Sequence, residues 1–275
     1  MAPAGARRAL APATTSSTGA TNSRSRRRKG LGAFAWASAA LFVAPPAGAV
    51  RPFITDDARV VGDRAAQLET WLRGDRRAFQ HWVAGGVGPV APLEVTLGGV
   101  YGREDGRFAY ALPLIQLKAL AVETKPGAGW PGVALAVGGF GPSGPGSRGH
   151  LRPANFDRFG YVALTQSVLP GGDDLLLHQN VGLFVAKRSE GRDPVITWGV
   201  GTQARLWGGL HFVGEIFSGD PYAAASGAAV QAGARYFVSS VVQVDSTVGR
   251  GIWGEPALPL WGTLGLRIAS APNFW

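Results

Sequence analysis

The chain has 275 residues, with no cysteine, 41 glycines and a formal net charge of +9. The lack of cysteine excludes disulfide frameworks, thiolate metal sites and cysteine nucleophiles. The charge does not indicate a nucleic-acid partner, because residues 1–49 contain seven of the 27 basic residues and no acidic one. The remaining 20 basic and 18 acidic residues form a near-neutral body, which lacks the electrostatic footprint that binds a phosphate backbone.

The N-terminal region has the three parts of a secretory signal peptide. A basic cluster, Arg26-Arg27-Arg28-Lys29, precedes a 13-residue apolar run from Leu31 to Val43, and Ala47-Gly48-Ala49 follows as a small-residue cleavage site. An N-terminal membrane anchor is the alternative, but a membrane-spanning helix needs about 20 apolar residues. The sequence therefore predicts a signal peptide over 1–49, cleavage after Ala49 and a mature domain over 50–275.

The mature region has the pattern of β-structure throughout. Segments of roughly ten residues, rich in aromatic and aliphatic side chains, are separated by clusters of Gly, Pro, Asp and Ser. In Ile196–Leu206 and Ala228–Val238, apolar residues alternate with glycine and polar residues. Strands of about 9–11 residues with one apolar and one polar face are typical of membrane barrels, whereas sandwich strands have about 5–6 residues.

The predicted fold class is all-β: a transmembrane antiparallel up-and-down β-barrel of about 12 strands in an outer membrane. An even strand number is typical of single-chain bacterial barrels. With the first strand starting in the periplasm, most of the longer connections fall on the extracellular side, as such barrels require. The strands are predicted near 65–73, 79–87, 93–103, 108–122, 132–140, 158–168, 175–187, 195–206, 210–218, 228–238, 241–250 and 260–269.

Charged and amide side chains on these strands are expected to face the lumen, because an Arg or Lys facing the bilayer midplane costs about 2–4 kcal/mol. Their signs alternate on successive strands, from Arg205 through Glu215 to Arg235 and beyond. Two interpretations remain open: a ladder of charge pairs that stabilises a narrow lumen, or a surface that recognises a solute. The candidate lumen-lining residues are Glu69, Lys118, Gln203, Arg205, Glu215, Gln231, Arg235, Gln243, Asp245 and Arg267.

Other motifs contain part of a cation site, a metal site or a hydrolase site, and each lacks some of the required residues. Thr55-Asp56-Asp57 has the oxygen ligands of a cation site, but without further spaced ligands it is interpreted as a polar lead-in to the first strand. The four histidines share no metal-binding spacing, so no metal site and no cofactor are predicted. His178-Gln179-Asn180 is the nearest ingredient of a hydrolase site, but no serine partner stands out and no catalytic residue is assigned.

Several short stretches carry a resemblance to a known group. They are Arg51-Pro52-Phe53-Ile54-Thr55-Asp56-Asp57-Ala58-Arg59-Val60, Gln67-Leu68-Glu69-Thr70-Trp71, Leu93-Glu94-Val95-Thr96-Leu97-Gly98-Gly99 and Gln116-Leu117-Lys118. Together they resemble proteobacterial outer-membrane proteins related to the meta-pathway phenol-degradation barrels. The resemblance covers roughly residues 50–120. It implies an outer-membrane barrel that admits small, hydrophobic compounds, and it supplies no catalytic residues.

Three functional hypotheses follow. The first is a narrow, porin-like channel for small molecules. The second is a closed barrel that acts as a structural or surface-interaction protein through Gly141–Asp157. The third, an outer-membrane hydrolase, has the least support, and the protein is not expected to be an enzyme. The expected partners are outer-membrane lipid, the barrel-assembly machinery and a small-molecule solute, with no nucleic acid.

Overall fold

The computed structural model describes residues 54–275 apart from 142–155, 171, 189–190, 220–226 and 255–257. The predicted signal peptide, its cleavage site at Ala49 and most of the Gly141–Asp157 connection lie outside these residues. Within the described part of the chain, no helix is long and apolar enough to cross a membrane.

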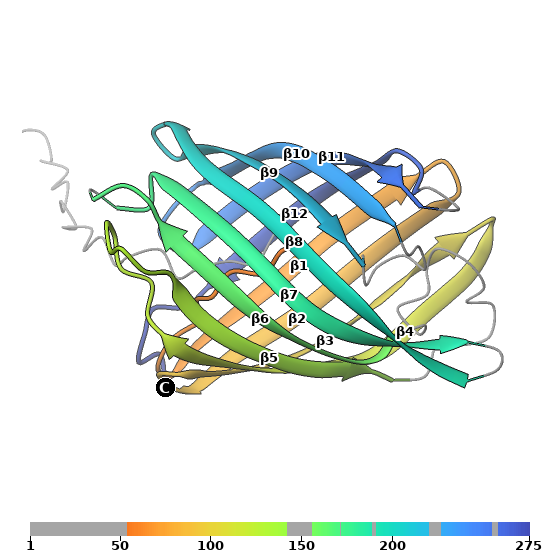
Figure 1. The fold of residues 1–275 in the computed structure, drawn as a ribbon, viewed down its shortest axis with the longest axis horizontal. Coiled ribbons are helices and arrows are strands. Elements are labelled where there is room, and N and C mark those ends of the chain that lie inside the picture. The colour runs from red at the N-terminus through yellow and green to blue at the C-terminus, as the bar shows by residue number, and fades with distance from the viewer. Residues whose placement is uncertain (1–53, 142–155, 171, 189–190, 220–226, 255–257) are drawn as a thin grey trace, which may run out of the picture. The chain divides into compact units, whose positions relative to one another are not determined.

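Twelve antiparallel strands form a closed barrel in which each strand pairs with its sequence neighbours and β1 pairs with β12 (Figure 1). This confirms the predicted fold class. The strands are β1 (Ala65–Asp75), β2 (Ala78–Val90), β3 (Leu93–Glu104), β4 (Arg107–Val122), β5 (Gly132–Phe140), β6 (Phe156–Ser167), β7 (Leu175–Arg188), β8 (Gly191–Trp207), β9 (Leu210–Ser218), β10 (Ala228–Phe237), β11 (Val242–Trp253) and β12 (Trp261–Ala269).

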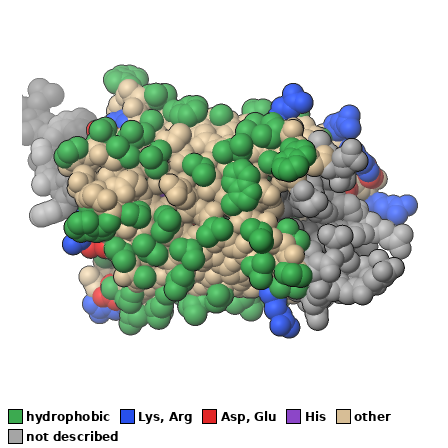
Figure 2. All heavy atoms as spheres, in the orientation of Figure 1, with side chains coloured by type: hydrophobic (Ala, Val, Ile, Leu, Met, Phe, Trp, Pro, Cys, Tyr) green, Lys and Arg blue, Asp and Glu red, His purple; other side chains and the backbone are tan. Residues whose placement is uncertain are grey.

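Period-two alternation separates two chemically different faces of the wall. Along β12, every second residue from Trp261 to Ala269 is buried, while Leu264, Leu266 and Ile268 are exposed. Apolar side chains accordingly cover much of the outside of the barrel (Figure 2). The opposite face is polar and buried, which is the arrangement that a hydrocarbon surround imposes on a closed barrel.

The two ends of the barrel differ in their connections. One end carries both the start of β1 and the end of β12, with two-residue turns at Ala91–Pro92 and Gly208–Gly209. The opposite end carries the connection from β5 to β6, which spans residues 141–155. Because the longer loops of bacterial barrels are extracellular, we call the end with the β5–β6 connection the outer end and the other the inner end.

Candidate functional site

The chain ahead of β1 lies inside the barrel. Residues 54–61, here called the plug, include Thr55, Asp56 and Asp57, each at most 2% exposed, and Ala58, which is fully buried. This differs from the expected lead-in to the first strand. A buried carboxylate is unfavourable unless a cation or several hydrogen-bond donors compensate it, so the surroundings of these two aspartates define the site.

Asp56 is held by three strands at once. The Lys118 ammonium on β4 donates to Asp56 Oδ1 at 2.9 Å, and both side chains are at most 3% exposed. The Tyr161 hydroxyl on β6 donates to Asp56 Oδ2 at 2.5 Å. The Asn180 amide on β7, oriented to satisfy both groups, donates to the Asp56 carbonyl at 2.8 Å and accepts from its N–H at 2.5 Å. These contacts satisfy the buried charge and the peptide around it.

Two lumenal glutamates hold the backbone at the ends of the plug. Glu215 on β9 accepts the N–H groups of Ile54 and Thr55 at 2.6 and 2.7 Å. Glu94 on β3 accepts the N–H of Val61 at 2.8 Å. Charge-assisted hydrogen bonds of this kind are stronger than neutral ones, and the plug is therefore anchored to opposite parts of the wall.

Asp57 forms a second buried network. Arg59 donates through Nε and Nη2 to Asp57 Oδ2 at 2.8 and 2.5 Å, and through Nη1 to Asp173 at 2.5 Å. Burial alone raises the pKa of Asp57, but the Arg59 guanidinium, together with His178 and Lys118, outweighs burial and holds that pKa well below its usual range. The Thr165 hydroxyl donates to Asp57 at 3.2 Å and contacts His178 Nδ1 at 3.0 Å.

The residues around Asp57 hold the plug in the lumen. The described residues contain no group of three or more His, Asp or Glu that could hold a metal ion. His178 is 1% exposed and lies against Thr165, whose hydroxyl also accepts the Ala58 N–H at 2.8 Å. Thr165 and His178 thus hold the plug in place.

A missing side chain on β8 makes room for the plug. A Cβ added at Gly199 would lie 2.2 Å from Thr55 Oγ1, far inside contact distance. Gly199 faces the lumen and is buried. A larger residue here would exclude the plug from its present position.

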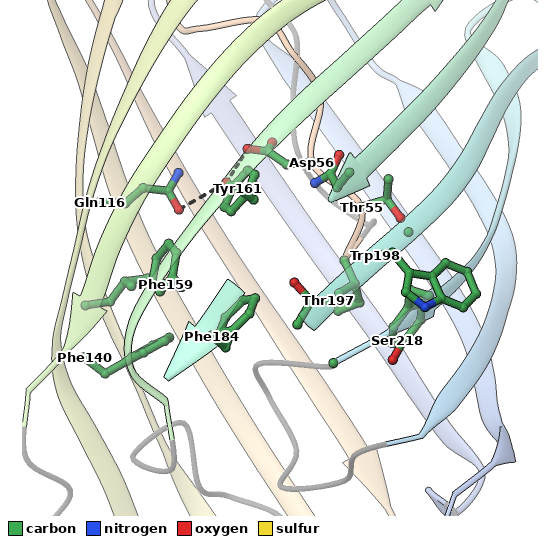
Figure 3. A pocket seen from close by; sticks show the side chains of 16 residues that line it. Thr55, Asp56, Gln116, Phe140, Phe159, Tyr161, Phe184, Thr197, Trp198 and Ser218 are labelled. Atoms are coloured by element: carbon green, nitrogen blue, oxygen red, sulfur yellow. Dashed lines mark hydrogen bonds between the residues drawn. The ribbon is translucent and has the colours of Figure 1, made fainter. Parts of the chain in front are cut away.

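A cavity of about 110 Å³ lies beside the plug on its outer-end side. Figure 3 shows Phe140, Phe159 and Phe184 on one side of it, Thr197 and Ser218 on the other, and Asp56 at its inner limit. The Phe159 ring lies 6.0 Å from Phe140 and 5.4 Å from Phe184, centroid to centroid. Gln116 and Asn180 add amide groups to a lining that is aromatic on one side.

The remaining predicted lumen residues lie mostly on β10, β11, β12 and β1, which we call the seam wall. Glu69 and Arg267 are directly opposed, with Nε 3.6 Å from Oε1. Arg235 is opposite Asp245 and donates to Gln203. Gln231 donates to Glu215 at 2.5 Å, and Gln243 is 1% exposed.

Arg205 lies elsewhere than expected. It is half exposed at the inner rim, where its Nε is 3.0 Å from Asp174. The predicted ladder also changes at Glu215, whose carboxylate binds plug backbone rather than an arginine. The period-two alternation predicts which face of a strand a residue lies on. Its height along the barrel depends instead on the stagger of all the strands.

Sequence reasoning missed the residues that hold the plug: Glu94, Tyr161, Thr165, Asn180 and Asp173. One signal was available. Lys118 is the only charged residue in Leu114–Val122, and the two carboxylates of Asp56-Asp57 have a single cation, Arg59, within three residues. Isolated opposite charges in apolar surroundings indicate a long-range pair.

Known proteins were compared with the chain in sequence and in structure. The profile of the family described as "Uncharacterised conserved protein UCP029691" matches residues 37–270, and no curated protein matches in sequence. The "COG4313 outer membrane channel from Pseudomonas putida F1" is similar in fold at 9% identity, with a TM-score of 0.54 over 76% of this chain and 96% of that one. The "KdgM porin" is similar at 5% identity, with a TM-score of 0.53 over 74% and 99%. The chain therefore belongs to the uncharacterised conserved family UCP029691, and its closed barrel of twelve strands resembles the barrels of outer-membrane porins and channels.

Proposed function

We propose that the protein is a narrow outer-membrane channel for small molecules, closed when the plug occupies the lumen and open when the plug leaves it. The observation that carries this proposal is the set of polar contacts between the plug and the barrel wall. Its backbone and carboxylates bind side chains on five strands, through Glu94, Lys118, Tyr161, Asn180 and Glu215. A polar anchorage of this kind can be exchanged for water when the plug moves, unlike an apolar core.

The cavity beside the plug indicates the kind of solute. Its lining is aromatic on one side and carries Gln116, Asn180 and Thr197. A dry cavity of about 150 Å³ holds a molecule of the size of benzene, so a cavity of about 110 Å³ suits a solute of a few heavy atoms or part of a larger one. We propose a small, partly apolar solute with one or two hydrogen-bonding groups.

The absence of cysteine permits a direct test with a disulfide. Ala58 on the plug and Ala163 on β6 pack in one buried cluster, so cysteines at both positions should cross-link the plug to the wall. In planar bilayers, the oxidised Ala58→Cys/Ala163→Cys protein should show no openings, and reduction should restore the openings of the wild type. Single-cysteine variants, treated with the same oxidant, control for oxidation itself.

A second candidate function is a barrel that stays closed and acts in structure or surface interaction. The number of contacts between plug and wall favours it. The same experiment separates the two, because a permanently closed barrel shows no openings in either redox state. Equal conductance of the oxidised and reduced double variant would contradict the proposed role of the plug as the gate.

A further inference from the structure

A groove of about 770 Å³ crosses the outside of the barrel near its outer end, where β11, β12 and β1 meet. Its lining combines apolar and charged residues. Val248 and Leu260 are 56% and 65% exposed, and Arg76, Arg250 and Asp75 lie along the same groove. The groove differs from the cavity beside the plug, with which it shares no lining residue.

Two glycines create this groove. Gly74 on β1 and Gly262 on β12 are directly paired and alternate with the lumenal residues Arg73 and Trp261. They therefore place no side chain on the outer face. A Cβ added at Gly262 would meet nothing closer than 3.9 Å, and one at Gly74 nothing closer than 3.6 Å. The depression is thus empty space on the lipid-facing side, with no packing requirement that explains it.

The two arginines of the groove have no partner among the described residues, where neither makes a side-chain hydrogen bond or ion pair. Asp75 forms no ion pair with either arginine, and its carboxylate accepts the N–H groups of Arg77 and Ala78 at 2.7 and 2.9 Å. Lys and Arg side chains gather at this end of the barrel (Figure 2).

The inner end is different. There the exposed arginines are paired: Arg205 lies 3.0 Å from Asp174, and Arg64 lies 3.8 Å from Asp63. Among the described residues, unpaired arginine beside lipid-exposed apolar surface thus occurs at the outer end, where the groove lies, and the exposed arginines of the inner end are paired. Guanidinium groups at the level of a membrane interface bind phosphate through paired N–H donors.

We propose that this groove binds a phosphorylated glycolipid of the outer leaflet. Arg76 and Arg250 hold a sugar phosphate at the water interface, and an acyl chain lies over Gly74, Gly262 and Val248. The geometry matches both parts of such a lipid, since cationic groups stand at the rim and the paired Gly74 and Gly262 leave a depression in the apolar wall beside them. A free phosphate ion would use the arginines alone and leave the trough empty.

The proposal is tested by native mass spectrometry of the refolded protein in detergent, with bisphosphorylated lipid A as the probe. The wild type should retain one lipid A through detergent exchange. The Arg76→Ala/Arg250→Ala variant should bind it roughly tenfold more weakly, and Gly262→Leu should weaken it similarly by filling the trough. Dephosphorylated lipid A and phosphatidylethanolamine should bind the wild type no more tightly than bisphosphorylated lipid A binds the double variant.

Matched controls stand elsewhere on the wall. Arg158 is an exposed arginine near the outer end of β6, and a Cβ at Gly85 of β2 would meet nothing closer than 3.9 Å. Arg158→Ala and Gly85→Leu should retain lipid A as the wild type does, and heat-modified gel mobility should show all variants folded. Three results would each overturn the proposal. The control variants could lose lipid A as the groove variants do, or the wild type could bind dephosphorylated lipid A as tightly as the bisphosphorylated form. The third is that the double arginine variant loses lipid A while Gly262→Leu binds it as the wild type does.

Discussion

The lumenal charges on two parts of the wall have different partners. On the seam wall, charges meet charges of neighbouring strands, as Glu69 meets Arg267 and Arg235 meets Asp245. On the wall from β3 to β9, Lys118 and Glu215 instead bind the plug. Both walls carry acidic and basic side chains, and the difference lies in their partners.

The difference separates two roles for buried charge in one lumen. A pair between neighbouring strands is retained whether or not the plug is present, so it stabilises the barrel. In the channel that we propose, a pair between wall and plug exists only in the closed state, so it sets the free energy of closure. Substitutions on the two walls should therefore be distinguishable: one group changes stability, and the other changes opening.

Lys118→Met should produce the largest effect. It leaves the Asp56 carboxylate buried without its cation, and removing one partner of a buried pair costs about 3–5 kcal/mol. The plug should leave the lumen, and the open fraction in planar bilayers should rise strongly while the barrel remains folded. Adding Asp56→Asn removes the stranded charge and should restore much of the closure. If Lys118→Met alone stays closed, the Lys118–Asp56 pair does not hold the plug.

Arg235→Ala removes a charge from the seam wall instead. We expect a loss of about 2 kcal/mol of barrel stability, because the buried carboxylate of Asp245 loses the cation opposite it. Heat unfolding followed by gel mobility measures this loss, and closure should be unchanged. In the Lys118→Met background, the open channel should shift toward cation selectivity, measured as reversal potential across a salt gradient. Arg235→Lys keeps the charge and should keep the selectivity.

Gly199→Ala should weaken closure through shape alone. The added methyl would lie 2.2 Å from Thr55 Oγ1, and overpacking of this kind costs about 1–3 kcal/mol. We expect more frequent openings and unchanged barrel stability, since the clash is with the plug. Gly85→Ala, on the outer face with no close neighbour, is the matched control. Equal behaviour of the two variants would contradict the tight fit between β8 and the plug.

The smallest expected effect is acid opening through Asp57. Arg59, His178 and Lys118 hold the pKa of this carboxylate well below the usual range, and because His178 and Lys118 belong to the wall, their share of the lowering exists only in the closed state. A lowered pKa stabilises the closed state above the ordinary Asp pKa, and this stabilisation is lost as the pH falls below it. Conductance should therefore be constant from pH 8 to 5 and rise below about pH 4, with about 1 kcal/mol lost at pH 3. Asp57→Asn should abolish that rise, whereas a rise already complete at pH 5 would assign it to another group.

The sequence alone determined the barrel and the two faces of its strands. Alternation in Ile196–Leu206 is a local property, because successive side chains point to opposite sides of a strand. Accordingly Trp198 and Val200 are exposed, and Gln203, five residues from Trp198, is buried. Lengths near ten residues and an even strand count then favour closure in a membrane over a sandwich.

The tertiary structure decided what fills the barrel and which charges meet. Thr55 and Glu215 are 160 residues apart, and no local period relates them. Whether Arg205 stands in the lumen or at the rim depends on the stagger summed over twelve strands, which no single strand encodes. Periodicity therefore gives the direction of each side chain, whereas the partner of each lumenal charge is set only when the barrel closes around the plug.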